Sequence, residues 1–213
     1  SDAHVLYRRL VGRAALSSGI DGQFFMRWRA AILALCALTA NASERVTICF
    51  NYACQAQAEV AYSDEQLREL RSLLGDASDA EQEQAAIGVA VGRLLGWAGK
   101  QSPIAADKGG NYADLGVYGK MDCIDHSMTT TRLLKMLEAQ GMLHYHRVLE
   151  RVLRRPFLVL DHYSAQIEEI SAGGDEGGDR RYVVDSWFFD NGQSAVVMPL
   201  GRWMSGESPD GGG

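Results

Sequence analysis

The segment from Gly119 to Gly141 constrains the fold most, because it combines a turn, a helix and a glycine stop. The residues that recur along it at helical spacing are Ile124, Met128, Thr131, Leu134 and Leu137. Asp122 is typical of a helix N-cap, and Gly141 supplies the left-handed residue that ends a helix. We therefore predict a helix whose first turn carries Cys123.

A cysteine in the first turn of a helix lies at the positive end of the helix dipole, among backbone N–H groups that have no partner within the helix. Both features favour the thiolate. To act as a nucleophile, Cys123 also needs a histidine base and a group that orients this base. The rest of the sequence contains candidates for both.

The N-terminal region has the three parts of a secretory signal peptide. Met26–Arg29 is short and basic, Ala30–Thr39 is apolar, and Ala40–Ala42 fits the small-x-small pattern before a cleavage site. The apolar run is too short to span a bilayer by itself. We therefore predict an upstream extension over 1–25, a signal peptide over 26–42, and export to the periplasm or the medium without a stable membrane span. The alternative is a buried amphipathic helix in a cytosolic protein.

The net charge and the cysteine content limit the classes of binding partner and the cellular compartment that fit the sequence. The formal charge of -6 argues against nucleic acid as a partner. One of the four cysteines, Cys36, falls within the predicted signal peptide. In an oxidising compartment the other three suggest one disulfide and one free thiol. Cys49 and Cys54 are close enough in sequence to pair, which leaves Cys123 free. The alternatives are that these two are only buried, or that all three stay reduced.

After one predicted strand near the start of the domain, the predicted helices precede the remaining predicted strands. We predict a strand over 45–52, helices over 64–74 and 79–97, a loop over 101–120 and, after Gly141, strands over 144–152, 157–170, 181–188 and 195–200. Asn191–Gly192 is a strong turn signal, so these strands should form an antiparallel meander. The order predicts one α+β domain over 43–205, with N-terminal helices packed on an antiparallel sheet, and a disordered tail over 206–213.

Three glycines mark one face of the predicted helix 79–97. Gly88, Gly92 and Gly96 are spaced by four residues. This spacing allows a second helix to approach closely, and we interpret it as packing within the protein and not as a membrane dimer motif.

Of the five histidines in the chain, three are weak candidates for chemistry. His126 is one helical turn from Cys123, and so local a histidine more often caps the helix or lies at the surface. His144 and His146 face the same side of a predicted strand, which is compatible with a metal pair. The sequence offers no evident third ligand, so we predict neither a metal nor an organic cofactor.

His162 is the stronger candidate base. It lies in a long apolar strand, and Asp185 lies in the next strand, so a hairpin would bring the two side chains together on one face. His162 would then take the proton of Cys123, and Asp185 would orient the imidazole and stabilise its charged form. Taken singly, His162 also fits a core histidine, and Asp185 a turn former at a strand end.

Two kinds of donor are available for an oxyanion. The backbone N–H of Cys123 lies at the helix start, where it can bond a tetrahedral oxyanion. Gln101, Asn111 and Tyr112 lie in the loop that leads to this helix, and the sequence does not choose among their side chains.

These motifs, in this order, resemble the transglutaminase-like cysteine peptidase superfamily. Met121–Asp125 resembles the Asp-Cys-x-Asp form of the bacterial transglutaminase-like cysteine proteinases, and Leu133–Gly141 resembles the end of their cysteine helix. His162–Tyr163 and Tyr182–Asp185 resemble their histidine and aspartate strands. The resemblance covers Lys120 to about Asn191, roughly a third of the chain, and does not extend to the part before it.

The resemblance implies a papain-like α+β core and a triad of Cys123, His162 and Asp185. It further implies attack on an amide bond in peptide, protein or cell-wall material, through an acyl-thioester that water or an amine resolves. The alternative is a catalytically inactive protein-binding module on the same fold, since a fold does not guarantee an activity.

Overall fold

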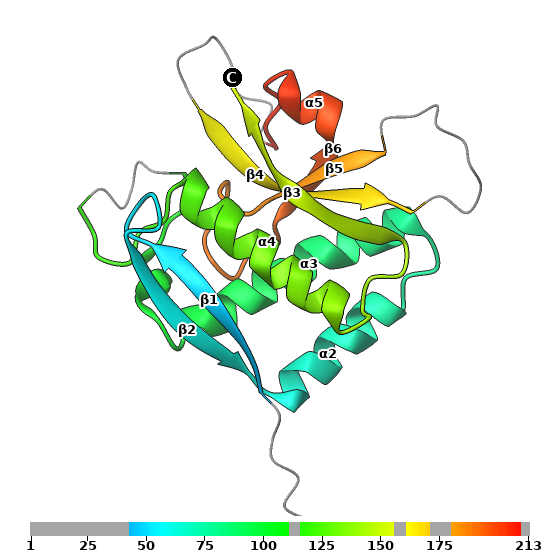
Figure 1. The fold of residues 1–213 in the computed structure, drawn as a ribbon, viewed down its shortest axis with the longest axis horizontal. Helices are drawn as coiled ribbons and strands as arrows, with labels where there is room; N and C mark the ends of the chain where they lie inside the picture. The colour runs from blue at the N-terminus through cyan, green and yellow to red at the C-terminus, as the bar shows by residue number, and fades with distance from the viewer. Residues whose placement is uncertain (1–42, 111–115, 156–160, 171–179, 210–213) are drawn as a thin grey trace, which may run out of the picture. The chain divides into compact units, whose positions relative to one another are not determined.

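The computed structural model describes residues 43–110, 116–155, 161–170 and 180–209, all within one compact unit, Asn41–Gly213. The predicted extension and signal peptide over 1–42 lie outside the described residues. The elements are β1 (Glu44–Phe50), β2 (Ala56–Tyr62), α2 (Asp64–Gly75), α3 (Ala80–Gly99), the 3-10 helix η1 (Pro103–Ala106), α4 (Cys123–Ala139), β3 (His146–Arg154), β4 (His162–Glu169), β5 (Arg181–Asp185), β6 (Val196–Pro199) and α5 (Leu200–Met204) (Figure 1).

The strands form two antiparallel sheets. β1 and β2 make a hairpin in which Glu44 pairs with Tyr62 and Phe50 with Ala56. β3, β4, β5 and β6 follow one another in a four-stranded meander. The predicted α+β class, with helices packed on an antiparallel sheet, is therefore confirmed, and so is the meander.

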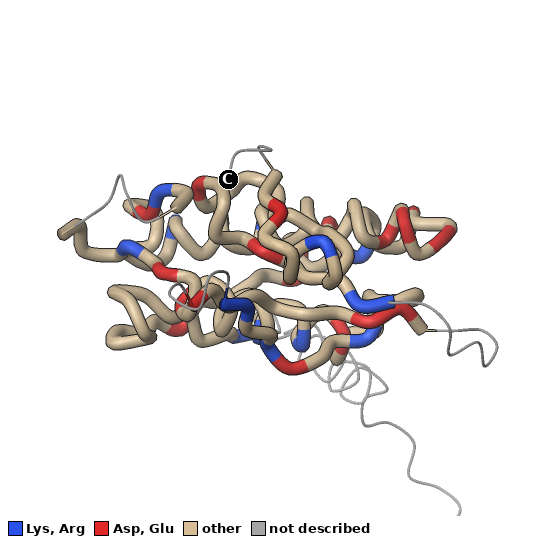
Figure 2. Tube along the Cα trace, turned by 90° about the horizontal axis from the view of Figure 1, so that it is seen from above, with Lys and Arg blue, Asp and Glu red and all other residues tan. Residues whose placement is uncertain are grey.

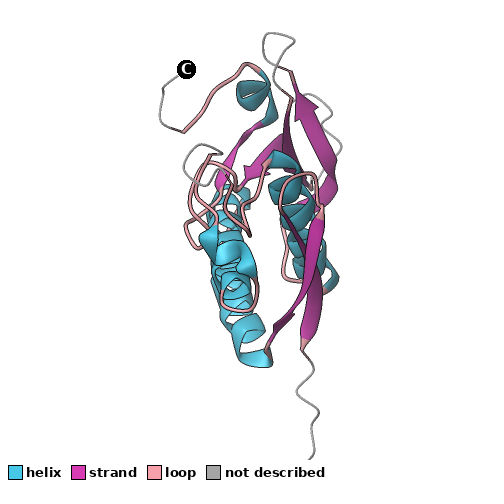
Figure 3. Ribbon diagram, turned by 90° about the vertical axis from the view of Figure 1, so that its left-hand side faces the viewer, coloured by secondary structure: helices cyan, strands magenta, loops and turns pink. Residues whose placement is uncertain are grey.

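Helix α4 is the element around which the others pack. It contacts both sheets and α3, and Figure 1 shows it running between the hairpin and the strands β3 and β4. Figure 3, turned by 90°, shows the strands of the hairpin along one side of the helices. Leu133, Leu134 and Leu137 are fully buried in the main core. The helix that carries Cys123 is thus fixed on several sides.

The predicted start and end of α4 are confirmed. Asp122 is the N-cap, and its side chain accepts a hydrogen bond from the backbone N–H of Asp125 while the Asp125 side chain accepts one from the N–H of Asp122. After the last turn, Gly141 has φ +65°, a backbone conformation that favours glycine. Cys123 is consequently the first residue of the helix.

The glycine face of α3 is packed, as predicted, but its partner is not a helix. A Cβ added at Gly88 would lie 2.7 Å from the carbonyl oxygen of Ala195, and one added at Gly92 would lie 2.7 Å from the carbonyl carbon of Gln193. The N–H of Ala195 also donates to the carbonyl of Gly88 over 3.0 Å. The segment that leads into β6 therefore lies directly on the helix backbone.

Several elements differ from the sequence predictions. β2 and α5 were not predicted, and the strand expected over 181–188 ends at Asp185, where the chain leaves the sheet. Gly206–Pro209, expected to be disordered, belongs to the described residues. Arg154 donates to the backbone carbonyl of Glu207 over 3.2 Å, which holds this segment against the end of β3.

Charged residues of both signs are mixed along the described chain, as Figure 2 shows. Exposed pairs such as Lys135 with Glu150, 2.7 Å apart, link neighbouring elements. None of the helices in the described ranges is long and apolar enough to cross a membrane.

Candidate active site

Cys123, His162 and Asp185 come from three different elements. Cys123 begins α4, His162 begins β4, and Asp185 ends β5. In the β4–β5 register Ala165 pairs with Val184, so Asp185 continues the ladder opposite Ser164 and lies diagonally across from His162 on the same face. His162 Nε2 is 2.8 Å from Asp185 Oδ2, and both side chains are buried. The strand register thus produces the predicted histidine–aspartate pair.

Asp185 is held by two further donors. The indole Nε1–H of Trp203 donates to Oδ2 over 3.0 Å, and the backbone N–H of Trp187 donates to Oδ1 over 3.2 Å. Trp203 is fully buried on α5, and Arg154 lies over its ring, 4.5 Å from the centroid. A carboxylate with this many donors has a fixed orientation. Sequence reasoning missed Trp203, because a five-residue helix after the last strand leaves no periodic signal.

Aromatic rings surround the imidazole of His162. The ring of Trp187 is 4.8 Å away in an edge-on arrangement, and those of Trp203 and Phe188 are 5.6 and 5.9 Å away. This burial disfavours the charged imidazole, but hydrogen bonds and charge interactions with Asp185 and Cys123 outweigh it. Together they raise the pKa of His162 from 6.5 to about 9. The site therefore favours a protonated imidazole at neutral pH.

Cys123 is the free thiol of the site. It is half-buried, and its Sγ lies 3.8 Å from the carbonyl oxygen of Asp161, the residue before His162. Nε2 of His162 is bonded to Asp185, and Cys123 is a second group whose interaction raises the pKa of His162. His162 therefore interacts with both Asp185 and Cys123.

The predicted disulfide is present. Cys49 and Cys54 are bonded, with their Cα atoms 4.6 Å apart, and they close the turn between β1 and β2. The four residues from Asn51 to Cys54 all have positive φ, between 48° and 66°, although none is glycine. Non-glycine residues in this conformation are strained and need support from their surroundings. Here the support comes from the disulfide and from the start of α4.

Successive backbone N–H groups of this turn donate to the capping carboxylates of α4. Tyr52 and Cys54 donate to Asp125 over 2.8 and 2.6 Å, and Ala53 donates to Asp122 over 2.9 Å. Burial and the nearby Asp122 carboxylate raise the pKa of Asp125 from 3.8 to about 6, against the lowering effect of these N–H donors. The disulfide turn and the first turn of the cysteine helix therefore form one hydrogen-bonded unit.

The remaining histidines do not form the metal pair considered above. His146 is buried, its Nδ1 lies 2.8 Å from Glu83 and its Nε2 lies 3.2 Å from Gln84, whereas His144 is exposed. In the described part of the chain, one cluster has the spacing of metal ligands, namely Asp125 with Cys49 and Cys54. Both sulfurs belong to the disulfide, which leaves no thiolate to bind a metal.

His126 is neither a surface residue nor a cap, contrary to expectation. It is 1% exposed, and its ring contacts Asp107 and Ser186. Only neighbours along the helix could be predicted from the sequence, whereas Asp107 and Ser186 come from distant segments.

The structure describes only some of the predicted oxyanion donors. The side-chain amide of Gln101 accepts a hydrogen bond from the N–H of Ala61 over 3.1 Å and donates one to its carbonyl over 3.0 Å. It joins the segment between α3 and η1 to β2. It therefore serves the packing of β2 in this structure. Asn111 and Tyr112 lie outside the described residues. Cys123 is the first residue of α4, where a backbone N–H has no partner within the helix, and its role as an oxyanion donor stays a prediction.

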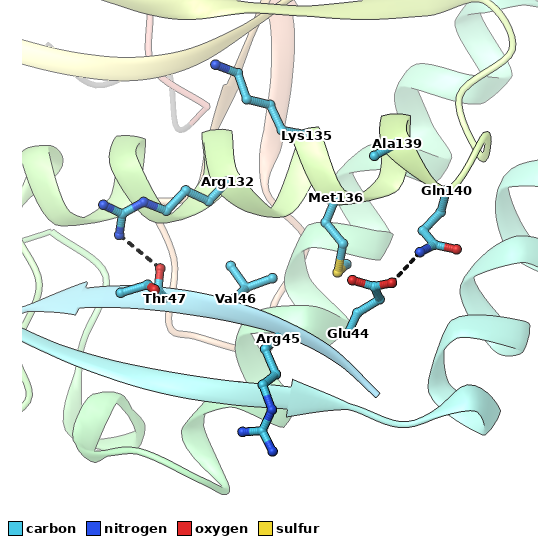
Figure 4. Close-up of a pocket in the computed structure, with 9 residues that line it drawn as sticks. All are labelled: Glu44, Arg45, Val46, Thr47, Arg132, Lys135, Met136, Ala139 and Gln140. Carbon is cyan, nitrogen blue, oxygen red and sulfur yellow. Dashed lines mark hydrogen bonds between the residues drawn. The ribbon is translucent and has the colours of Figure 1, made fainter. Parts of the chain in front are cut away.

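A groove of about 500 Å³ lies farther along α4, between this helix and β1 (Figure 4). Arg132 lines the groove and donates to the carbonyl of Thr47 over 3.0 Å, while Arg45 and Lys135 point away from it. Because its cationic groups do not converge, we interpret the groove as a packing seam between helix and hairpin.

Comparisons with known proteins identify no relative. No protein-family model matches the chain, no curated protein matches it, and no solved structure matches it. The function therefore has to be inferred from the geometry of the site.

The disulfide assignment predicts which thiols react. If the unfolded, unreduced protein is treated with an alkylating reagent, we expect Cys123 to be modified and Cys49 and Cys54 to stay unmodified in peptide mass spectra. After reduction all three should react. Reduction should also lower the free energy of unfolding by about 2 kcal/mol, the value expected for so short a closed loop. Modification of Cys49 before reduction would contradict the assignment.

Proposed function

We propose that this protein is an exported cysteine-dependent amide hydrolase or acyltransferase with Cys123 as nucleophile, His162 as acid–base residue and Asp185 as the residue that orients His162. The observation that carries the proposal is the position of His162, whose Nε2 lies 2.8 Å from Asp185 Oδ2 and whose pKa is raised by interactions with both Asp185 and Cys123. The disulfide between Cys49 and Cys54 supports the export part, because disulfides persist mainly in oxidising compartments.

The chemistry follows from this series of groups. The Cys123 sulfur attacks the amide carbonyl, and the backbone N–H of Cys123 bonds the oxyanion that forms. His162 then gives its proton to the leaving amine, the C–N bond breaks, and an acyl-thioester remains on Cys123. His162, now neutral, takes a proton from water or from an acceptor amine as it attacks the thioester, and the thiolate is released. Asp185 holds the imidazole through Nε2 throughout.

Hydrolysis and transfer differ only in the group that resolves the thioester. Peptide, protein and cell-wall amides all present the carbonyl that this mechanism requires. The second candidate is a binding module on the same fold, favoured by the close packing of Trp187, Trp203 and Phe188 around His162. In that case Cys123 would have no chemical role.

The deciding experiment is the rate of Cys123 alkylation by iodoacetamide as a function of pH. Ordinary thiols have a pKa of about 8.5 and react slowly at about pH 6. We expect Cys123 to react fast at that pH, because protonated His162 stabilises the thiolate. A profile that follows ordinary thiols throughout would remove the support for a nucleophile and favour the binding module.

The titration of His162 provides a second prediction. The pKa of about 9 means that the folded protein binds this proton more tightly than the unfolded chain does. The contribution to stability is therefore complete below about pH 6.5, the ordinary pKa of histidine, and is lost as the pH rises through about 9. We expect NMR of the imidazole to show titration near the upper value. In Cys123→Ala the midpoint should fall, since one of the groups that raises the pKa is gone; an unchanged midpoint would contradict the pairing.

A further inference from the structure

A chain of buried hydrogen bonds lies beneath the candidate active site. Thr130 Oγ1 is 2.9 Å from Ser186 Oγ, Ser186 Oγ is 2.9 Å from His126 Nδ1, and His126 Nε2 is 3.1 Å from Asp107 Oδ2. All four side chains are buried, with Ser186 the most exposed at 7%. We refer to Thr130, Ser186, His126 and Asp107 as the buried bridge.

The buried bridge connects the segments that carry the triad. His126 and Thr130 lie one and two turns after Cys123 on α4, and Ser186 directly follows Asp185. Ser186 also precedes Trp187, whose backbone N–H donates to Asp185 and whose ring packs on His162. The link between His126 and Ser186 therefore joins the nucleophile's helix to the strand end that holds the acid.

The other end of the bridge fixes the approach to Cys123. Asp107 accepts a hydrogen bond from the backbone N–H of Met121 over 2.7 Å, two residues before the cysteine. It accepts another from the side-chain amide of Asn191 over 3.2 Å, and the same amide donates to the carbonyl of Ile104 over 3.0 Å. The carboxylate of Asp107, at the end of η1, therefore binds both the loop before α4 and the loop after β5.

A serine, a histidine and an aspartate in contact could form a second catalytic triad with Ser186 as nucleophile. The burial of Ser186 argues against this role. The Ser186 hydroxyl is covered and engaged with both Thr130 and His126, so no substrate carbonyl reaches it. A hydrogen-bonded chain of this kind stiffens the segments that it joins, because every polar group in it is satisfied only in one arrangement.

We propose that the buried bridge sets the separation between Cys123 and His162, with His126 and Ser186 as positioning residues that contact neither substrate nor the reacting atoms. The inference rests on the proposed function, because it concerns the reactivity of the same thiol. Loss of the His126–Ser186 link frees the first turn of α4 to move relative to β5. A displacement of about 1 Å in such a site costs about 10²-fold in rate.

The test compares Ser186→Ala and His126→Gln with the matched control Glu83→Gln. Glu83 and His146 form another buried carboxylate–histidine pair, 2.8 Å apart, which joins α3 to β3 and does not contact the triad. For each protein we measure iodoacetamide labelling of Cys123 against pH and unfolding by urea. Ser186→Ala removes a single hydroxyl, so it carries the test if His126→Gln does not fold; Thr130→Val is a second mild variant.

We expect Ser186→Ala and His126→Gln to slow labelling at about pH 6 by about 10- to 100-fold, and to move the pH profile toward that of an ordinary thiol. Glu83→Gln should destabilise the protein and leave the profile unchanged. If Ser186→Ala loses stability but keeps the wild-type profile, the bridge is structural only and the inference is wrong. If the wild-type protein itself labels as an ordinary thiol, the proposed function fails, and the inference fails with it.

Discussion

Replacing His162 with alanine is expected to lower acyl-transfer activity by about 10⁶-fold, the loss typical of removing the histidine of such a triad. In the proposed mechanism, His162 both stabilises the Cys123 thiolate and supplies the proton for the leaving amine. Alkylation of Cys123 at about pH 6 should become slow and should follow the curve of an ordinary thiol. The measurement is the iodoacetamide rate across pH, followed by release of an amine from peptide substrates.

His144→Ala is the matched control for this substitution. His144 is exposed and lies outside the candidate site, so its loss should leave the labelling profile as it is in the wild-type protein. If His162→Ala keeps fast labelling at low pH, the imidazole does not activate Cys123. The triad would then have to be abandoned, whatever the fold.

Replacing Gly92 with alanine is expected to destabilise the fold by about 3 kcal/mol, the upper end of the usual penalty for overpacking. The added Cβ would lie 2.7 Å from the carbonyl carbon of Gln193, and backbone atoms cannot turn aside as a flexible side chain does. The segment before β6 would have to move away from α3. Urea unfolding, with the midpoint and slope both fitted, measures the change.

Gly75→Ala tests whether this loss is specific to the packed glycine face. Gly75 is the last residue of α2, and a Cβ added there meets nothing within 4 Å. Alanine at this position should be neutral, or should stabilise by up to about 0.5–1 kcal/mol through the smaller entropy of the unfolded chain. Equal losses in the two variants would mean that helix propensity, and not the contact with Gln193, decides.

Elements whose signal is local were the ones that the sequence predicted best. The cap at Asp122 and the stop at Gly141 act within a few residues of α4, so its bounds were predictable. The meander followed from strand periodicity. The expected proximity of His162 and Asp185 needed only the knowledge that consecutive antiparallel strands pair, and the structure brings the two side chains together. Their catalytic roles stay a prediction.

Elements that depend on distant partners were missed. β2 is rich in alanine, glutamine and glutamate, which favour helices, and it becomes a strand by pairing with β1 across the disulfide turn. His126 is buried because Asp107 and Ser186 reach it from 19 and 60 residues away. Similarly, the glycine face of α3 predicted that another segment packs closely on the helix, but it did not predict which segment.

The short disulfide also bears on how the chain acquires its oxidised form. Cys49 and Cys54 are five residues apart, whereas Cys123 lies 69 residues beyond Cys54. Closing the shorter loop is favoured by about 2 kcal/mol, because closure entropy grows with the logarithm of loop length. During oxidative folding, Cys49 and Cys54 therefore meet about 30 times more readily than either meets Cys123. The spacing alone biases oxidation toward a product in which Cys123 remains reduced.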